Sequence, residues 1–187
     1  MANSVTDICN SALQRIGANT ILNILDNSPE ARACNVAYDS NRRDELRKYR
    51  WRFAITRVVL APDATTPAFD YTYQFTLPSD CLRIIFPSDY QNDWLVEGRK
   101  ILTNDGTSLN LRYITDVTDT TLFDASFYNV IAAALAIDIC ERLTQSTTKK
   151  QMVIKQYQDD IAAAKLADSM EINFVDSPDD SWESARV

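Results

Sequence analysis

The fold of this chain is decided by the stretch Phe127-Tyr128-Asn129-Val130-Ile131-Ala132-Ala133-Ala134-Leu135-Ala136-Ile137-Asp138-Ile139-Cys140. Its apolar residues cover most faces of a helix, and a helix that is apolar nearly all round is buried nearly all round. The longest apolar run has eight residues, 130–137, which is far short of the roughly 20 that span a bilayer. The sequence therefore predicts a soluble protein with a buried central helix that ends near Leu143.

Two helices are predicted before this stretch. In the first, Val5–Ile16, apolar residues recur at the spacing of an amphipathic helix, and Gly17 stands where a helix would end. The second begins at Asn27-Ser28-Pro29-Glu30, where a cap-type side chain precedes a proline, and runs to about Tyr49. Its apolar stripe is thin, so this helix must share its burial with a partner. The stripe comprises Ala33, Val36, Ala37 and Leu46.

A last helix is predicted after the central one, capped by Ser146 or Thr147. Its apolar stripe comprises Met152, Ile154 (or Val153), Tyr157, Ile161, Ala164 and Ala167. Residues 172–187 have no sustained period, are acidic and contain a proline. Such a polar tail would normally fray, yet Phe174 and Trp182 are costly to leave exposed. We therefore expect an extended arm that orders on binding a partner.

Between residues 55 and 116 the period of the apolar residues changes to two, which is typical of strands. Large apolar side chains alternate with polar ones over residues 71–77 and would share one face of a strand. Glu97-Gly98-Arg99 and Asn104-Asp105-Gly106 are turn signals. Further strands are predicted at 55–60, 81–86, 94–96, 100–103 and 109–113. Together they form a small antiparallel β unit.

The predicted fold class is therefore α+β. Residues 1–54 and 117–171 form an antiparallel helical bundle, which has two N-terminal and two C-terminal helices. Residues 55–116 form a β-rich insertion, and residues 172–187 form an extended C-terminal arm. At 187 residues the chain is long enough to fold alone and to bury roughly 70% of the surface of its unfolded form.

The composition excludes most common enzyme mechanisms. The chain has no histidine, so a Ser-His-Asp triad, a Cys-His pair or a histidine-bearing zinc site cannot form within it. Its three glycines are scattered, so a phosphate-cradling loop cannot be built. The cysteines lie at Cys9, Cys34, Cys81 and Cys140 with no C-x-x-C spacing, and we expect free buried thiols. We expect neither enzymatic activity nor a cofactor or metal.

Three acids follow the β unit, at Asp116, Asp119 and Asp124. A cation site is one interpretation, but the run lacks the glycine and the final glutamate of a calcium loop. The structural interpretation is stronger: Asp116 ends a strand, and Asp124 caps the central helix. Asp138 and Glu141 are the only candidates for a carboxylate pair that hydrolyses glycosides, and an interface or an ion pair accounts for them better.

Charge is distributed unevenly along the chain, whose net charge is −7. Residues 42–57 contain seven bases and two acids, whereas residues 158–187 contain eight acids and two bases. Such opposite segments invite pairing, within one chain or between copies. We consider three interpretations of the basic segment: a solvated helix end, a site for single-stranded nucleic acid, or an inter-subunit stripe of Arg42, Arg43, Arg47 and Arg50.

Several short motifs, taken in order, resemble the tail tubular protein A family, the head-to-tail adaptors or gatekeepers of short-tailed bacteriophages. The resemblance covers nearly the whole chain, and it is the order of the motifs that carries it. In relatives a proline often follows the aspartate before the central helix, where this chain has Ala125. The motifs are Cys9-x-x-Ala12-Leu13-x-x-Ile16-Gly17, Asn27-Ser28-Pro29-Glu30-Ala31-Arg32 with Tyr38 and Leu46, Trp51-Arg52-Phe53-Ala54, Leu77-Pro78-x-Asp80-Cys81-Leu82-Arg83, Val96-Glu97-Gly98-Arg99-Lys100-Ile101-Leu102, and Tyr113-Ile114-x-Asp116-Val117-x-Asp119 with Phe123, Asp124 and Phe127.

The resemblance implies a structural virion protein, assembled in the host cytoplasm and located in the tail connector. It implies a homo-oligomeric ring, typically dodecameric, between the portal protein and the tail nozzle or tubular protein B. Genomic DNA would pass through the ring without sequence-specific binding, and no membrane is involved. The arm, through Phe174, Trp182 and Arg186, would bind the portal or a neighbouring subunit. The alternative is a cell-wall or polysaccharide hydrolase associated with the phage tail.

Overall fold

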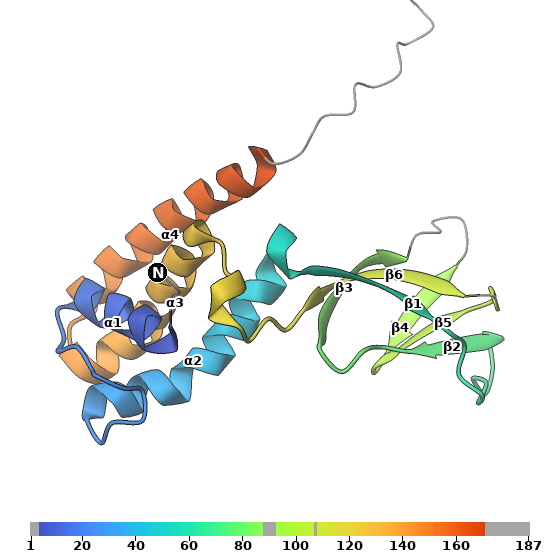
Figure 1. The fold of residues 1–187 in the computed structure, drawn as a ribbon, viewed down its shortest axis with the longest axis horizontal. Helices are drawn as coiled ribbons and strands as arrows, with labels where there is room; N and C mark the ends of the chain where they lie inside the picture. Colours follow the sequence, from blue (N-terminus) through green and yellow to red (C-terminus); the bar gives the residue numbers. More distant parts are fainter. Residues whose placement is uncertain (1–3, 88–92, 107, 171–187) are drawn as a thin grey trace, which may run out of the picture.

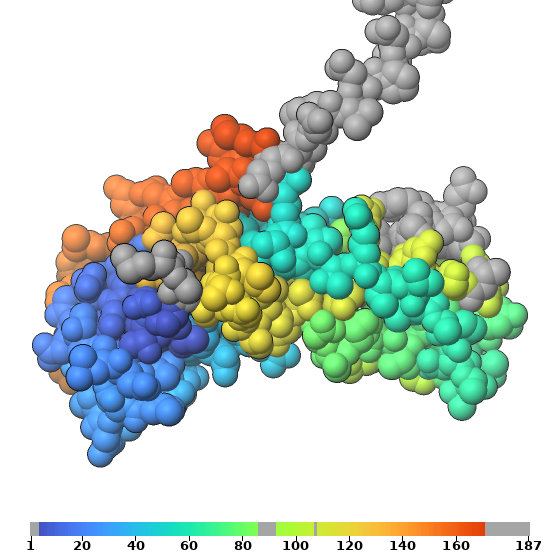
Figure 2. Space-filling view, in the orientation of Figure 1, coloured from blue at the N-terminus to red at the C-terminus, as the bar shows by residue number. Residues whose placement is uncertain are grey.

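The computed structural model describes residues 4–87, 93–106 and 108–170. The described part contains four α-helices and two antiparallel sheets of three strands each, which confirms the α+β class. The helices gather at one end of the elongated molecule and the strands at the other (Figure 1). Segments near residues 50–60 and 110–125, turquoise and yellow in Figure 2, bridge the two parts. None of the described helices is long and apolar enough to cross a membrane.

The two N-terminal helices begin and end where their cap residues dictate. Helix α1, Val5–Ile16, starts with a capping box between Ser4 and Asp7 and ends at Gly17, whose φ of 67° is left-handed. Helix α2, Pro29–Lys48, starts at Ser28, whose hydroxyl accepts a hydrogen bond from the amide of Ala31. The predicted starts and ends of both helices are confirmed to within a residue.

Helix α3, Ala125–Thr144, is the centre of the helical part, as its apolar sequence predicted. It packs against α1, α2 and the last helix, α4, Thr147–Met170. Its ten buried residues lie on every side of the helix and include Phe127, Ile131 and Leu135. The four cysteines are all buried and free, which confirms the prediction made for them.

Two details of the predicted apolar stripes are wrong. Val36 is 75% exposed, because the buried face of α2 runs through Cys34 and Tyr38 instead. In α4 the alternative Val153 is buried together with Ala164, whereas Met152 is 69% exposed and Ala167 is exposed as well. Both errors arise because a weak stripe on a polar helix leaves the rotation of the helix undetermined, and the neighbouring helices decide it.

The strands form two sheets that face each other. One sheet has the order β1-β6-β3 and the other β2-β5-β4, with every pairing antiparallel. Side chains from both sheets, among them Phe75, Ile101, Leu111 and Tyr113, form a core separate from that of the helices. The bounds are Ile55–Leu60 for β1, Tyr73–Thr76 for β2, Cys81–Pro87 for β3, Trp94–Glu97 for β4, Lys100–Thr103 for β5 and Leu109–Thr115 for β6.

Glycines stand at two positions where the β part requires them. Gly98 turns the β4–β5 hairpin with a φ of 58°, a conformation that other residues adopt at a cost. Gly106 lies against the ring of Tyr73, so closely that a Cβ there would stand 2.1 Å from a ring carbon. The turn signals in the sequence therefore mark a real hairpin and a real close approach.

Trp51 connects the helical part to the β part. Its side chain is fully buried, and its indole nitrogen donates to the carbonyl oxygen of Glu45 at 2.9 Å. Its ring packs edge-on against Tyr49 and Phe127. The short 3₁₀ turn η1, Arg52–Ala54, follows at once and leads into β1. This anchor fixes where the basic segment leaves α2.

Candidate interaction surfaces

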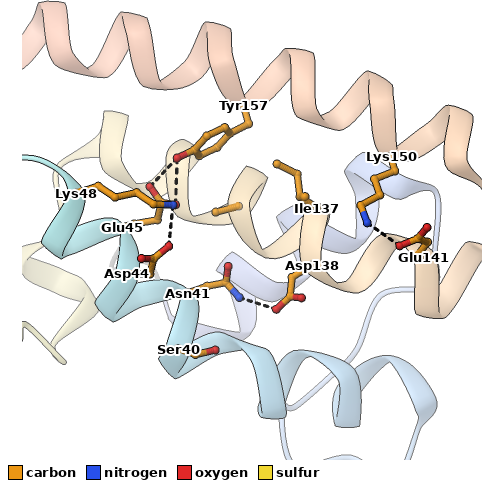
Figure 3. A pocket seen from close by; sticks show the side chains of 11 residues that line it. Ser40, Asn41, Asp44, Glu45, Lys48, Ile137, Asp138, Glu141, Lys150 and Tyr157 are labelled. Atoms are coloured by element: carbon orange, nitrogen blue, oxygen red, sulfur yellow. Dashed lines mark hydrogen bonds and ion pairs between the residues drawn. The ribbon is translucent and has the colours of Figure 1, made fainter.

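An open groove of about 600 Å³ lies between α2, α3 and α4 (Figure 3). Helix α2 contributes Asp44, Glu45 and Lys48, and α3 contributes Asp138 and Glu141. Carboxylates outnumber cations on its walls, so the groove is polar and acidic. Its residues come from α2 and from α3 and α4, which lie more than 70 residues further along the sequence. No sequence motif predicted the groove.

A buried carboxylate is the core of this groove. Glu45 is 1% exposed. Its carboxylate oxygens accept hydrogen bonds from the Tyr157 hydroxyl at 3.0 and 3.1 Å. The Lys48 ammonium group forms an ion pair with the same carboxylate at 2.7 Å. Burial and then the Glu45 charge raise the pKa of Tyr157 to about 12. Burial opposes the charge on Lys48, but its bonds to Asp44 and Glu45 outweigh burial and raise the pKa of Lys48. The cluster is satisfied internally and ties α2 to α4.

The two carboxylates considered for hydrolysis lie on the same groove but have partners. Asp138 accepts from the Asn41 side chain at 2.9 Å, and Glu141 pairs with Lys150 at 2.6 Å (Figure 3). Both side chains are exposed. Asp138 therefore links α3 to α2, and Glu141 links α3 to α4, through polar contacts at the surface.

The three acids after the β unit have separate structural roles. Asp119 accepts from the Thr121 amide at 2.9 Å and from its hydroxyl at 2.7 Å, which starts the 3₁₀ turn η2, Thr120–Leu122, and lowers the pKa of Asp119. Asp124 accepts from the Ser126 amide at 2.7 Å and caps α3. The capping role predicted for Asp124 is therefore confirmed, and Asp119 caps the 3₁₀ turn in the same way. Within residues 4–87, 93–106 and 108–170, no group of three or more acids or cysteines is arranged to hold a metal ion.

Asp116 differs from the other two because it forms ion pairs. Its carboxylate binds the guanidinium groups of Arg42 and Arg43, the latter at 3.3 Å. Arg42 is only 4% exposed and also donates to the carbonyl oxygen of Val117 at 2.7 Å. Arg42 thus has its contacts within its own chain, and its place in the inter-subunit stripe stays a prediction.

The other three members of that stripe lie in different surroundings. Arg43 is more than half exposed beside Asp116, and Arg47 donates to the carbonyl oxygen of Leu82 at 2.7 Å, at the start of β3. Arg50 is exposed and lies one residue before Trp51. Their role between subunits stays a prediction. Phe174, Trp182 and Arg186, and the arm as a whole, lie outside the described residues.

A second arginine group, which sequence reasoning missed, surrounds a hollow of about 390 Å³ where the two parts of the molecule meet. Arg50, Arg52, Arg57 and Arg112 line it, and the acid on its wall is Asp168 near the end of α4. We call this hollow the arginine cleft. Arg112 lies more than fifty residues away in the sequence, so only the pairing of β1 with β6 brings it to the basic segment.

The acidic and basic segments meet at this cleft. Asp168 accepts from the Arg52 amide at 3.1 Å and pairs with its side chain at 3.7 Å. The charge pattern invited pairing within one chain or between copies, and this contact shows that pairing within the chain occurs.

Helix α4 presents an unusual outer face. Of its 24 residues only Val153 and Ala164 are buried. Three large apolar side chains point to solvent, with exposures of 69% for Met152, 58% for Leu166 and 74% for Met170. Single exposed apolar residues are common on any surface, but several on one long helix make its outer face a candidate contact surface.

No model of a known protein family matches the chain, and no curated protein matches it.

Proposed function

We propose that this chain is a structural head-to-tail adaptor of a short-tailed bacteriophage. The observation that carries the proposal is the ordered set of motifs that resemble tail tubular protein A. Several of these motifs occupy junctions of the fold: Ser28 caps α2, Trp51 anchors the exit from α2, Gly98 turns the β4–β5 hairpin and Asp124 caps α3. A fold shared with that family over the whole chain explains motifs at such scattered junctions better than chance does.

In this proposal, copies of the chain form a ring, expected to be dodecameric, between the portal protein and the tail nozzle or tubular protein B. The outer face of α4 supports this, because Met152, Leu166 and Met170 gain a covering surface when neighbours pack in a ring. Head-to-tail contacts close into rings when the rotation between copies is right. The arm, with Phe174 and Trp182, would add the contact to the portal or to the next subunit.

The charge of the chain is compatible with a channel for DNA. A net charge of −7 repels the phosphate backbone, whereas basic walls would bind it tightly and slow its passage. In the proposed role the genome crosses the ring without sequence-specific contacts.

Electron microscopy of the purified chain mixed with its portal protein tests the proposal. We expect rings that cap the portal, and failure to form them under any condition would overturn it. A matched chain that lacks residues 172–187 should keep its circular dichroism spectrum but lose assembly. If the shortened chain still docks on the portal, the role given to the arm is wrong while the adaptor role stands.

A further inference from the structure

We propose that the arginine cleft is a docking surface for residues 171–187 of the same chain. This inference concerns the isolated protein and does not depend on the adaptor role. Its ligand is a carboxylate-rich peptide segment, and its receptor is the group formed by Arg50, Arg52, Arg57 and Arg112.

The cleft gathers positive charge from separate elements. Arg50 follows α2, Arg52 belongs to η1, Arg57 to β1 and Arg112 to β6. Four guanidinium groups thus line one hollow of about 390 Å³, and Asp168 is the carboxylate on its wall. Guanidinium groups bind carboxylates through paired, charge-assisted hydrogen bonds, so such a hollow suits an acidic ligand.

Two of these arginines repel each other across the sheet. Arg57 and Arg112 are direct partners in the antiparallel β1–β6 register, and like charges directly opposite one another destabilise a strand pair. A carboxylate placed between them turns this repulsion into two attractive contacts. Arg83 and Arg47 add positive charge near Arg50. Burial and then the charges of Arg50 and Arg47 lower the pKa of Arg83.

The end of α4 already delivers a carboxylate to the cleft. Asp168 binds the backbone amide and side chain of Arg52, and Ser169 lines the same hollow. The segment that follows carries five acids, Glu171, Asp176, Asp179, Asp180 and Glu183, and one base, Arg186. It therefore starts at the edge of the cleft with complementary charge.

The length of the segment permits docking within one chain. Seventeen residues, 171–187, reach about 55 Å when extended, far more than the width of such a cleft. A short tether gives its acids an effective concentration in the millimolar range at the cleft. Nucleic acid has no such tether, so a peptide ligand from the same chain is favoured over phosphate.

Zero-length carbodiimide cross-linking of the full chain tests this docking. The variants Arg57→Lys and Arg112→Lys, made singly, keep the positive charge and add an amine that couples only to a carboxylate in contact with it. The matched control is Arg32→Lys, an exposed site in the first turn of α2, about 24 Å from the other end of that 20-residue helix. Mass spectrometry locates each cross-link, and a mixture of ¹⁴N and ¹⁵N chains separates contacts within a chain from contacts between chains.

We expect cross-links from the introduced amines to Asp176, Asp179, Asp180 or Glu183, within chains of one isotope. High salt should remove most of them, and Arg32→Lys should give none. Absence of cross-links to residues 171–187 overturns the proposal, as do cross-links only between chains of different isotope. If the unmodified chain binds single-stranded DNA at low salt and loses at least tenfold in affinity in Arg57→Glu, while the tail gives no cross-link, the cleft is a nucleic-acid site and the proposal fails.

Discussion

The Arg42 guanidinium binds the Asp116 carboxylate across 74 residues of sequence and joins the middle of α2 to the residue that follows β6. Arg42 is almost completely buried, and the side chain of Asp116 is 20% exposed. The pair therefore fastens the return of the chain from the β part to the helical part. A cation that looked available for partners in the sequence is held inside the fold.

Replacing the carboxylate of this pair should destabilise the protein. Asp116→Asn removes the closer of the two carboxylates that pair with the buried Arg42; the other, Asp39, lies 3.5 Å away and is largely exposed. We expect a loss of about 2 kcal/mol in the free energy of unfolding. Urea unfolding followed by circular dichroism measures it. Asp119→Asn, only three residues away but exposed and capping a 3₁₀ turn, is the matched control and should cost less. Equal losses in the two variants would contradict a buried ion pair.

The Tyr157–Glu45 contact should make stability depend on alkaline pH. The pKa of Tyr157 is about 12 in the folded protein and about 10 in an unfolded chain. A raised pKa contributes stability that is complete below about pH 10 and is lost as the pH rises through about 12. Lys48, whose pKa is also raised, adds a loss in the same direction.

Tyr157→Phe removes the tyrosine contribution and should flatten the fall in stability between about pH 10 and 12. Absorbance titration should show one late tyrosinate fewer in this variant. An unchanged slope, with the late titration still present, would assign the shift to another tyrosine.

The outer face of α4 should be required for assembly but not for folding. Leu166→Glu places a charge on an exposed apolar position, so we expect an unchanged melting temperature and at least a tenfold weaker ring assembly on the portal. Sedimentation of the complex measures assembly. Gln156→Glu adds the same charge at an exposed polar position of α4 and serves as the control. Normal assembly of the Leu166→Glu variant would remove α4 from the interface.

The proposed structural role predicts no hydrolysis of cell-wall polymers. A zymogram of the purified chain should show no clearing, because Asp138 and Glu141 are exposed and bound to Asn41 and Lys150. Clearing that disappears in Asp138→Asn or Glu141→Gln would instead establish the alternative hydrolase. Those variants at the groove should otherwise change stability by less than about 1 kcal/mol.

The sequence by itself determined the local structure. The apolar run around Leu135 predicted the central helix, Ser28 and Asp124 marked helix starts, and Gly98 marked a hairpin. These features depend on residues that are neighbours along the chain, where periodicity and capping chemistry act directly.

Only the tertiary structure decided which charges meet. Arg42 forms an ion pair with Asp116, and Tyr157 donates a hydrogen bond to Glu45. The pairing of β1 with β6 places Arg112 beside the basic segment. The exposure of Val36 was settled by how α2 rotates against its neighbours. The sequence shows which residues are charged and which positions are apolar. Which charged side chains pair depends on their distance in space, because burial and Coulomb attraction act between side chains that packing brings together.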